Sequence, residues 1–249
     1  MDVLTLIFVF IVGFLGSFLG NMIGGGGGLI TVPGMIMLGI PPQVVVATKK
    51  LGTFGSSLPS IYLFSKAKKI VTELTIPLAI GSLIGSAIGA KILIEINEEL
   101  FSKLLAIMLL IALPFTFLKK DFGLVRKVKS KLSRFIGFVT YYFVAIFNGF
   151  MGAGGGLIQT YSLINFNGLT YIEANGTKKI PYLFGRILST IIFAAVGLID
   201  YVLALILFVS CFFGAYLGSK VAINKGDRFI KIIFSFVVFV LAIKLLFFP

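Results

Sequence analysis

The sequence predicts an all-α protein that crosses a membrane several times and is built from two related halves. Of its 249 residues, 58% are hydrophobic and only 12% are charged, with a mean hydropathy of +1.10. Charged residues at this frequency cannot cover a water-exposed surface, and lipid must therefore solvate much of the chain. Apolar runs of about 20 residues recur along it, long enough to cross ~30 Å of hydrocarbon as helices.

The two halves are identified by three collinear blocks that occur twice. The segment GGGLI at 26–30 recurs at 154–158, an offset of 128 positions. Farther along, Thr-Lys-Lys at 48–50 recurs at 177–179, and a block of small residues ending in lysine at 85–91 recurs at 214–220. Because the matched residues are Gly, Thr and Lys rather than Leu, general apolar similarity does not explain them, and an internal repeat does.

Each half contains the same series of elements: a long apolar run, a glycine cluster, a short apolar run and three further spans. We expect an N-terminal repeat over 1–118, a basic linker over 119–133, a C-terminal repeat over 134–249, and 8 to 10 membrane segments in all. The first run lacks a basic start and is followed by glycines, so we expect it to remain as a span. The predicted elements are 3–20, 29–38, 44–64, 74–94 and 100–118, then 135–150, 157–166, 171–196, 201–222 and 229–248.

The charges between the spans indicate the topology. The linker carries seven Lys and Arg residues through position 134 against one acid, Asp121, which places it in the cytoplasm. The basic segment 66–69 then falls inside and the acidic segment 95–99 outside. If each glycine cluster forms a hairpin that returns to its starting face, the basic residues of 220–228 also fall inside and Asp200 outside. The halves would then be inverted repeats; one net crossing per hairpin would instead make them parallel.

The glycine clusters are the strongest candidates for a binding site. Each Gly in a helix interior costs ~1 kcal/mol relative to Ala, so we expect both clusters to be unwound. The short run after each, about ten residues, is a half-helix whose N-terminal N–H groups favour an anion. Alternatively, the glycines only allow close helix packing. The candidate positions are Gly24, Gly26, Gly27, Gly28, Gly152, Gly154, Gly155 and Gly156.

Cationic side chains inside apolar spans are the second candidate feature. One lysine of each repeated pair, 49–50 and 178–179, faces the cavity or else reaches the headgroups. Arg186 lies deep within a span and contacts either a substrate or a structural carbonyl or carboxylate partner. Neutral polar residues such as Thr31 and Gln159 either complete a ligand shell or bond neighbouring helices.

Several function classes are excluded. Histidine is absent and Cys211 is the single cysteine, so we expect no metal centre, no disulfide and no cofactor. The acids Glu73, Glu173 and Asp200 lie at predicted span ends, so neither enzymatic chemistry nor a relay of acids is supported. The formal charge of +13 sits mostly between spans rather than in a nucleic-acid-binding surface.

The glycine motif at 24–33, Ala47-Thr48, the second motif at 152–156 and Thr177-Lys178 together resemble the sulfite exporter TauE/SafE family over essentially the whole chain. The resemblance implies a multi-pass protein of the cytoplasmic membrane that carries a small anion such as sulfite or an organosulfonate; a passive anion channel with the glycine turns as its filter is the alternative. Expected partners are the anion and membrane lipid, and a homo-oligomer remains open. The expected substrate-binding residues are Gly24, Gly26, Gly27, Gly28, Thr31, Thr48, Lys49, Gly152, Gly154, Gly155, Gly156, Gln159, Thr177, Lys178 and Arg186.

Overall fold

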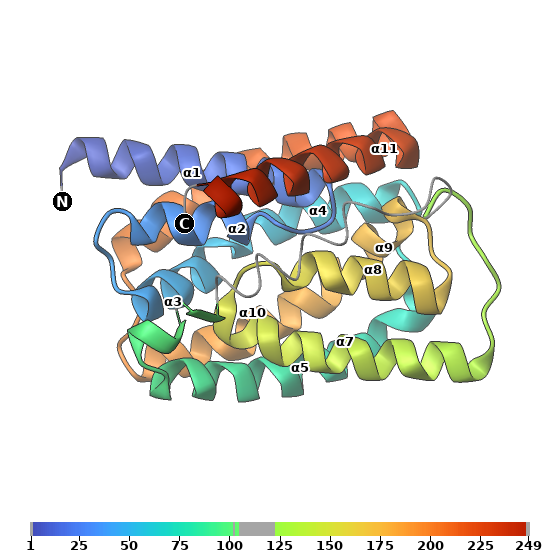
Figure 1. Ribbon diagram of the computed structural model, residues 1–249, viewed down its shortest axis with the longest axis horizontal. Helices are drawn as coiled ribbons and strands as arrows, with labels where there is room; N and C mark the ends of the chain where they lie inside the picture. Colours follow the sequence, from blue (N-terminus) through green and yellow to red (C-terminus); the bar gives the residue numbers. More distant parts are fainter. Residues whose placement is uncertain (1, 102, 105–122, 248–249) are drawn as a thin grey trace.

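The computed structural model describes residues 2–101, 103–104 and 123–247, and in this part of the chain the regular structure is entirely helical (Figure 1). The first half contains α1 (Val3–Met22), α2 (Gly28–Ile36), α3 (Pro42–Gly52), α4 (Phe54–Lys66) and α5 (Thr72–Glu95). The second contains α7 (Lys131–Met151), α8 (Gly155–Asn167), α9 (Tyr171–Thr177), α10 (Lys179–Ala195) and α11 (Tyr201–Phe247). The all-α prediction is therefore confirmed.

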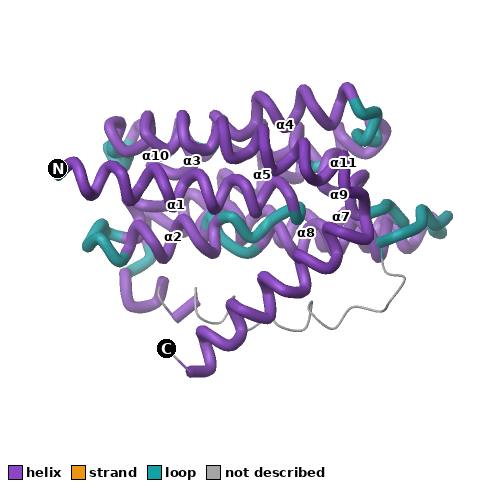
Figure 2. The backbone as a smooth tube through the Cα atoms, turned by 90° about the horizontal axis from the view of Figure 1, so that it is seen from above, coloured by secondary structure: helices purple, strands orange, loops and turns teal. Residues whose placement is uncertain are grey.

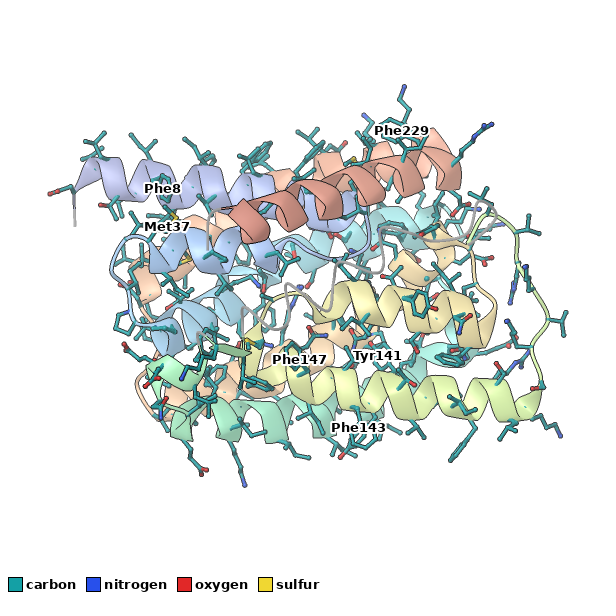
Figure 3. All side chains as sticks on the ribbon, viewed as in Figure 1. Phe8, Met37, Tyr141, Phe143, Phe147 and Phe229 are labelled. Carbon is teal, nitrogen blue, oxygen red and sulfur yellow. The ribbon has the colours of Figure 1, made fainter. Side chains whose placement is uncertain are left out.

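Four helices in the described part are long and apolar enough to cross a membrane: α1, α5, α7 and the Tyr201–Ile230 portion of α11. Their outer faces carry exposed apolar side chains, as expected where lipid is the solvent. On α7, for example, Phe143 is 62% exposed while Tyr141 is 1% exposed (Figure 3). The predicted span 100–118 lies almost wholly outside the described residues.

Two of the predicted spans are each divided into two helices. The predicted span 44–64 becomes α3 and α4, which meet at Thr53, and 171–196 becomes α9 and α10, which meet at Lys178. Pro181 lies in the first turn of α10, where its missing N–H is tolerated, so the helix restarts just before it. At the other break, the Thr53 hydroxyl donates to the Lys49 carbonyl at 2.8 Å, a local bond that competes with regular helix.

The two halves are interlocked rather than stacked side by side. Helix α1 packs along α11 of the second half, and its counterpart α7 packs along α5 of the first half. Most helices run along the long axis of the molecule, whereas α11 turns at Gly226 and its last part runs obliquely (Figure 2). This break coincides with the predicted boundary between the spans 201–222 and 229–248.

Each glycine-broken helix pair is a hairpin. Helix α8 returns to the end of the molecule where α7 began. Two hydrogen bonds show this: the Lys127 N–H donates to the Gly168 carbonyl at 2.8 Å, and Ser133 Oγ donates to the Phe166 carbonyl at 2.9 Å. In Figure 1, α1 runs away from the N-terminus at the left toward the right, and α7 runs from right to left. Corresponding first helices of the two halves therefore point in opposite directions.

The same end of the molecule collects basic loops. Asp227, beside Lys225 and Arg228, accepts a hydrogen bond from the Ile172 N–H at 2.7 Å, and Gly168 contacts the basic linker. At the opposite end, Gln43 donates to the Ile96 carbonyl at 2.9 Å, next to the acidic segment 95–99. The loops thus separate by charge, in the manner that charge bias produces across a membrane.

Candidate functional site

Both glycine clusters are unwound. Gly24, Gly25 and Gly26 have φ angles of 79°, 149° and 83°, and Gly152 and Gly154 have φ angles of 63° and 76°. Residues with a side chain rarely adopt such angles, whereas glycine does so freely. The prediction that regular helix stops at these two clusters is confirmed.

The two turns touch in the middle of the molecule. A Cβ atom added to Gly25 would lie 2.5 Å from the Gly156 carbonyl carbon and 2.6 Å from the Leu157 nitrogen. A Cβ atom on Gly28 would collide with the Gly152 carbonyl in the same way. The backbones of the two halves therefore approach at a distance that only glycine allows.

The first lysine of each repeated pair reaches across to the turn of the other half. Lys49 donates to the Gly152 carbonyl, and Lys178 donates to the Gly24 carbonyl. These contacts are equivalent under the sequence repeat. Each lysine thus ties its own half to the unwound backbone of its partner half.

The second lysine of each pair also crosses between halves. Lys50 donates to the Asn148 carbonyl at 2.6 Å, and Lys179 donates to Asn21 Oδ1 at 2.7 Å. We expected only one lysine of each pair at the cavity, yet both members of both pairs contribute. Adjacent residues of a helix point about 100° apart, and the two lysines of a pair accordingly reach different acceptors around the two cavities.

Lys178 differs from the other three lysines because its donors are all used. Besides the Gly24 carbonyl, it donates to the Gly156 carbonyl at 2.7 Å and to Thr160 Oγ1 at 2.5 Å, and it is 1% exposed. An ammonium group has three N–H donors, so this set is complete. Lys178 clamps the two turns together.

Arg186 on α10 faces the loop between α3 and α4. Its Nη1 donates to the Thr53 carbonyl at 2.9 Å and to Ser57 Oγ at 2.7 Å, with Ser56 Oγ at 3.2 Å. Its guanidinium carbon lies 5.7 Å from the ring centroid of Tyr182, within cation–π range. The structural partners are thus a carbonyl and hydroxyls, while Nη2 and Nε make no hydrogen bond to any described residue.

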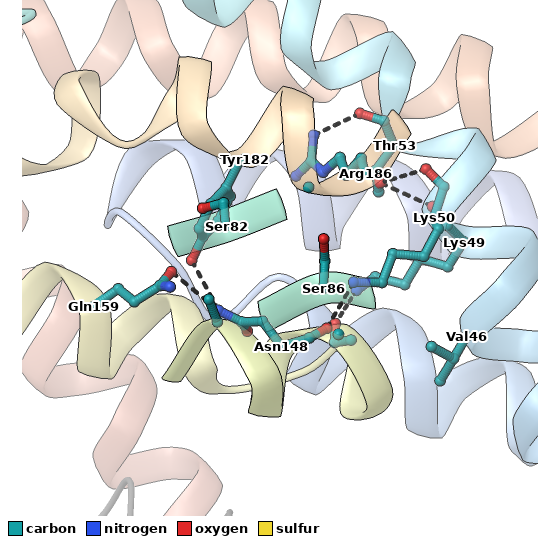
Figure 4. A pocket seen from close by; sticks show the side chains of 14 residues that line it. Val46, Lys49, Lys50, Thr53, Ser82, Ser86, Asn148, Gln159, Tyr182 and Arg186 are labelled. Carbon is teal, nitrogen blue, oxygen red and sulfur yellow. Dashed lines mark hydrogen bonds between the residues drawn. The ribbon is translucent and has the colours of Figure 1, made fainter. Parts of the chain in front are cut away.

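Two adjoining cavities surround these groups. The first, here called the Lys50 cavity, has a volume of about 80 Å³ and is shown in Figure 4. The second, the Lys179 cavity, has a volume of about 110 Å³ and is lined by the first glycine turn. Six residues line both cavities and form their common wall: Lys49, Thr53, Asn148, Gly152, Tyr182 and Arg186.

Most of the residues singled out from the sequence line these cavities. The Lys179 cavity is lined by Gly26, Gly27, Gly28, Thr31, Lys49, Gly152, Gly154, Gly156, Lys178 and Arg186, and Gln159 lines the Lys50 cavity. Gly24 and Gly155 belong to the turns but line neither cavity. Gly155 packs against the Asn148 side chain, where an added Cβ would collide with it.

Thr48 and Thr177 line neither cavity and instead hold helix ends. The Thr48 hydroxyl accepts the N–H of Asp200, which precedes α11, and the Thr177 hydroxyl accepts the N–H of Val71, which precedes α5, both at 3.0 Å. Both threonines are fully buried. Each half therefore fixes the start of a long span of the other half.

Sequence reasoning gave no site role to Tyr182. Its hydroxyl accepts from Asn148 Nδ2 at 3.3 Å, and Lys178 Nζ lies 5.4 Å from its ring centroid. The available signal was its position four residues before Arg186, which places both side chains on one face of a helix. It had no counterpart in the first half, where Thr53 occupies the equivalent position.

The charge of the site is strongly one-sided. Five cationic side chains, those of Lys49, Lys50, Lys178, Lys179 and Arg186, line the two cavities, and no carboxylate does among the described residues. The ion pairs found in the described part lie elsewhere, at Lys103–Glu99 and Arg126–Glu173. Buried charges without partners are costly, so this arrangement is suited to an anion that supplies the missing negative charge.

Comparison with known proteins agrees with this geometry. The model of the family described as "Sulfite exporter TauE/SafE" matches residues 9–245. The chain is 28% identical to a "Probable membrane transporter protein" of Haemophilus influenzae, over 99% of this chain and 96% of the relative. It is 27% identical to the "Probable membrane transporter protein ORF9" of a Sinorhizobium species, over 97% and 92%, and 24% identical to the "Probable membrane transporter protein YfcA" of Escherichia coli K12, over 96% and 88%.

No solved structure gives a significant match. The family match covers nearly the whole chain, including both glycine turns, both lysine pairs and Arg186. The chain is therefore a multi-pass membrane protein that belongs to the sulfite exporter TauE/SafE family.

Proposed function

We propose that this protein is a secondary carrier for a small anion, with sulfite or an organosulfonate as its substrate class. The observation that carries the proposal is that five cationic side chains line the two cavities, while no carboxylate is found among the described lining residues. The printed description of the family and the transporter names of the relatives support it. The anion is the compensating charge that the site lacks.

The donors at the site match the acceptor pattern of a sulfite or sulfonate group. Such a group presents three oxygens that only accept hydrogen bonds. Lys49 retains two unused N–H donors, and Arg186 offers Nη2 and Nε. The N–H groups of Gly26, Gly27 and Gly28 make no hydrogen bond to described residues and lie at the start of α2, where the helix dipole favours negative charge.

We further propose that the repeats 1–118 and 134–249 are inverted and move relative to each other around the fixed central site, exposing it alternately to the two sides of the cytoplasmic membrane. The opposite directions of α1 and α7 and the separation of basic from acidic loops support this arrangement. With the linker 119–133 in the cytoplasm, Asp200 faces outward. The turns, held together by Lys49 and Lys178, would be the pivot.

Uptake into proteoliposomes tests the proposal. We expect ³⁵S-sulfite uptake under anaerobic conditions to saturate and to be accelerated by unlabelled sulfite inside the vesicles. Arg186→Gln should lower the initial rate at least tenfold, while Lys91→Gln, on the exposed end of α5, should leave it unchanged. Wild-type rates for Arg186→Gln, or single-channel conductance steps in place of saturation, would count against the carrier.

A further inference from the structure

We infer that the site binds two anions at once, one in the Lys50 cavity and one in the Lys179 cavity. This inference rests on the proposed function and adds the number of substrate ions to it. The structural basis is that the internal repeat has duplicated the cationic binding elements and placed one copy in each cavity.

The two cavities have distinct cationic ends and a shared middle. Lys50 lines only the Lys50 cavity, and Lys179 lines only the Lys179 cavity, whereas Lys49 and Arg186 border both. A single small anion in one cavity leaves the lysine at the end of the other without a negative partner. Both ends are therefore satisfied only when both cavities are occupied.

The unused hydrogen-bond donors divide in the same way. Lys50 makes one hydrogen bond, to the Asn148 carbonyl, and Lys179 makes one, to Asn21 Oδ1. Each ammonium group thus keeps two N–H donors for a ligand, unlike Lys178, whose three donors are used within the protein. Lys179 is 9% exposed, so these donors have little access to water.

Polar groups other than lysine also line each cavity. Ser82 and Ser86 of α5 line the Lys50 cavity (Figure 4), where the Ser82 hydroxyl bonds to Tyr141 Oη at 3.3 Å and the Ser86 hydroxyl donates to the Leu83 carbonyl at 3.1 Å. The Lys179 cavity is lined by the backbone of Gly26, Gly27 and Gly28 at the N-terminal end of α2, whose N–H groups make no hydrogen bond to described residues. One probe-sized volume of ~10–15 Å³ holds a water molecule, so cavities of about 80 and 110 Å³ each have room for an anion of several atoms.

The charge count points the same way. Four lysines and one arginine give up to five positive charges around the joined cavities, with no carboxylate among the described lining residues. One monovalent or divalent anion leaves most of that charge uncompensated in a low-dielectric setting. A second anion, so that one lies beside Lys50 and one beside Lys179, reduces the uncompensated positive charge. Lys49 and Arg186 lie on the wall between the two cavities and screen the two anions from each other.

Equilibrium binding of ³⁵S-sulfite to the full chain in lipid nanodiscs, under anaerobic conditions, tests this inference. We expect two sulfite ions per wild-type chain, one per chain for Lys50→Met and one for Lys179→Met, and two for the control Lys91→Met. The number of sulfite ions bound per wild-type chain is measured without any variant, so the test holds even if a variant does not fold.

One sulfite ion per wild-type chain, with saturable uptake in proteoliposomes, would overturn the two-anion inference and leave the proposed carrier standing. Loss of all binding in both Lys50→Met and Lys179→Met, with the folded state verified by thermal unfolding, would also overturn it, since it indicates one shared place. No binding and no uptake by the wild type would remove the proposed substrate class together with this inference.

Discussion

Substitution of Gly25 by alanine tests the contact between the two glycine turns. The added Cβ would lie 2.5 Å from the Gly156 carbonyl carbon and 2.6 Å from the Leu157 nitrogen. Non-bonded carbon atoms settle at about 3.5–4.0 Å, so the two turns must separate by roughly 1 Å. Backbone atoms cannot move aside as a flexible side chain does, and overpacking of this kind costs about 1–3 kcal/mol.

The consequence for transport is larger than the consequence for folding. A displacement of about 1 Å in the groups that position a substrate can lower a rate on the order of 100-fold. We therefore expect Gly25→Ala to reduce the initial rate of ³⁵S-sulfite uptake by between tenfold and 100-fold, at an unchanged amount of reconstituted protein. The thermal unfolding midpoint should fall only modestly.

The matched control is Gly39→Ala. Gly39 also has a positive φ angle, 77°, but an added Cβ there meets nothing within 4 Å. It therefore carries the backbone strain of about 1–2 kcal/mol without the collision between halves. Uptake by Gly39→Ala should stay within twofold of the wild type; equal rates for both variants would refute the reasoning that the turns must touch.

Three other predictions concern helix ends, the lysines and topology. Thr177→Val leaves the partly buried Val71 N–H without its acceptor and should lower the free energy of unfolding by about 1 kcal/mol. Thr190→Val, whose buried hydroxyl has no partner among the described residues, should not lower it, and equal melting curves of the two variants in detergent would contradict this. Lys49→Met should weaken sulfite binding at least tenfold with little change in melting temperature, and Lys178→Met should lower the melting temperature; the reverse pattern would exchange their roles. In a Cys211→Ala background, an impermeant maleimide added to intact cells should label a cysteine at Asp200 but not one at Lys225, and labelling of both from outside would remove the inverted arrangement.

Much of the fold followed from the sequence because the relevant signals were strong. Lipid-solvated spans need long apolar runs. The five consecutive glycines at 24–28 would each cost about 1 kcal/mol in a helix interior, so a break in the helix was expected there. The helix breaks at Thr53 and Lys178 were not predicted, because 44–64 and 171–196 were each predicted as one continuous span despite the polar and glycine residues within them. Gly52 and Gly55, on either side of Thr53, were the signal for the first break. Pro181 was the signal for the second break.

The candidate site could be predicted only in part. Repetition identified Lys49 and Lys178 but made them appear equivalent, whereas the structure gives Lys178 three hydrogen bonds and Lys49 one. One of the two additional bonds traces to the sequence, since Thr160 supplies a hydroxyl to Lys178 and Val32, its counterpart in the first half, supplies none. The other goes to the Gly156 carbonyl, whereas the carbonyl of Gly28, the counterpart of Gly156, accepts no hydrogen bond from Lys49. Such a departure from symmetry gains meaning only when the side chains are placed in space.

The bound position of the anion is the most direct test of this account. Selenite is an analogue of sulfite whose selenium atom scatters X-rays anomalously, so crystals soaked with it locate the ligand without prior assumptions. We predict anomalous peaks in the cavities bordered by Lys49 and Arg186, where the turns at 24–28 and 152–156 meet. Peaks confined to the surface, with these cavities empty at saturating selenite, would contradict the account.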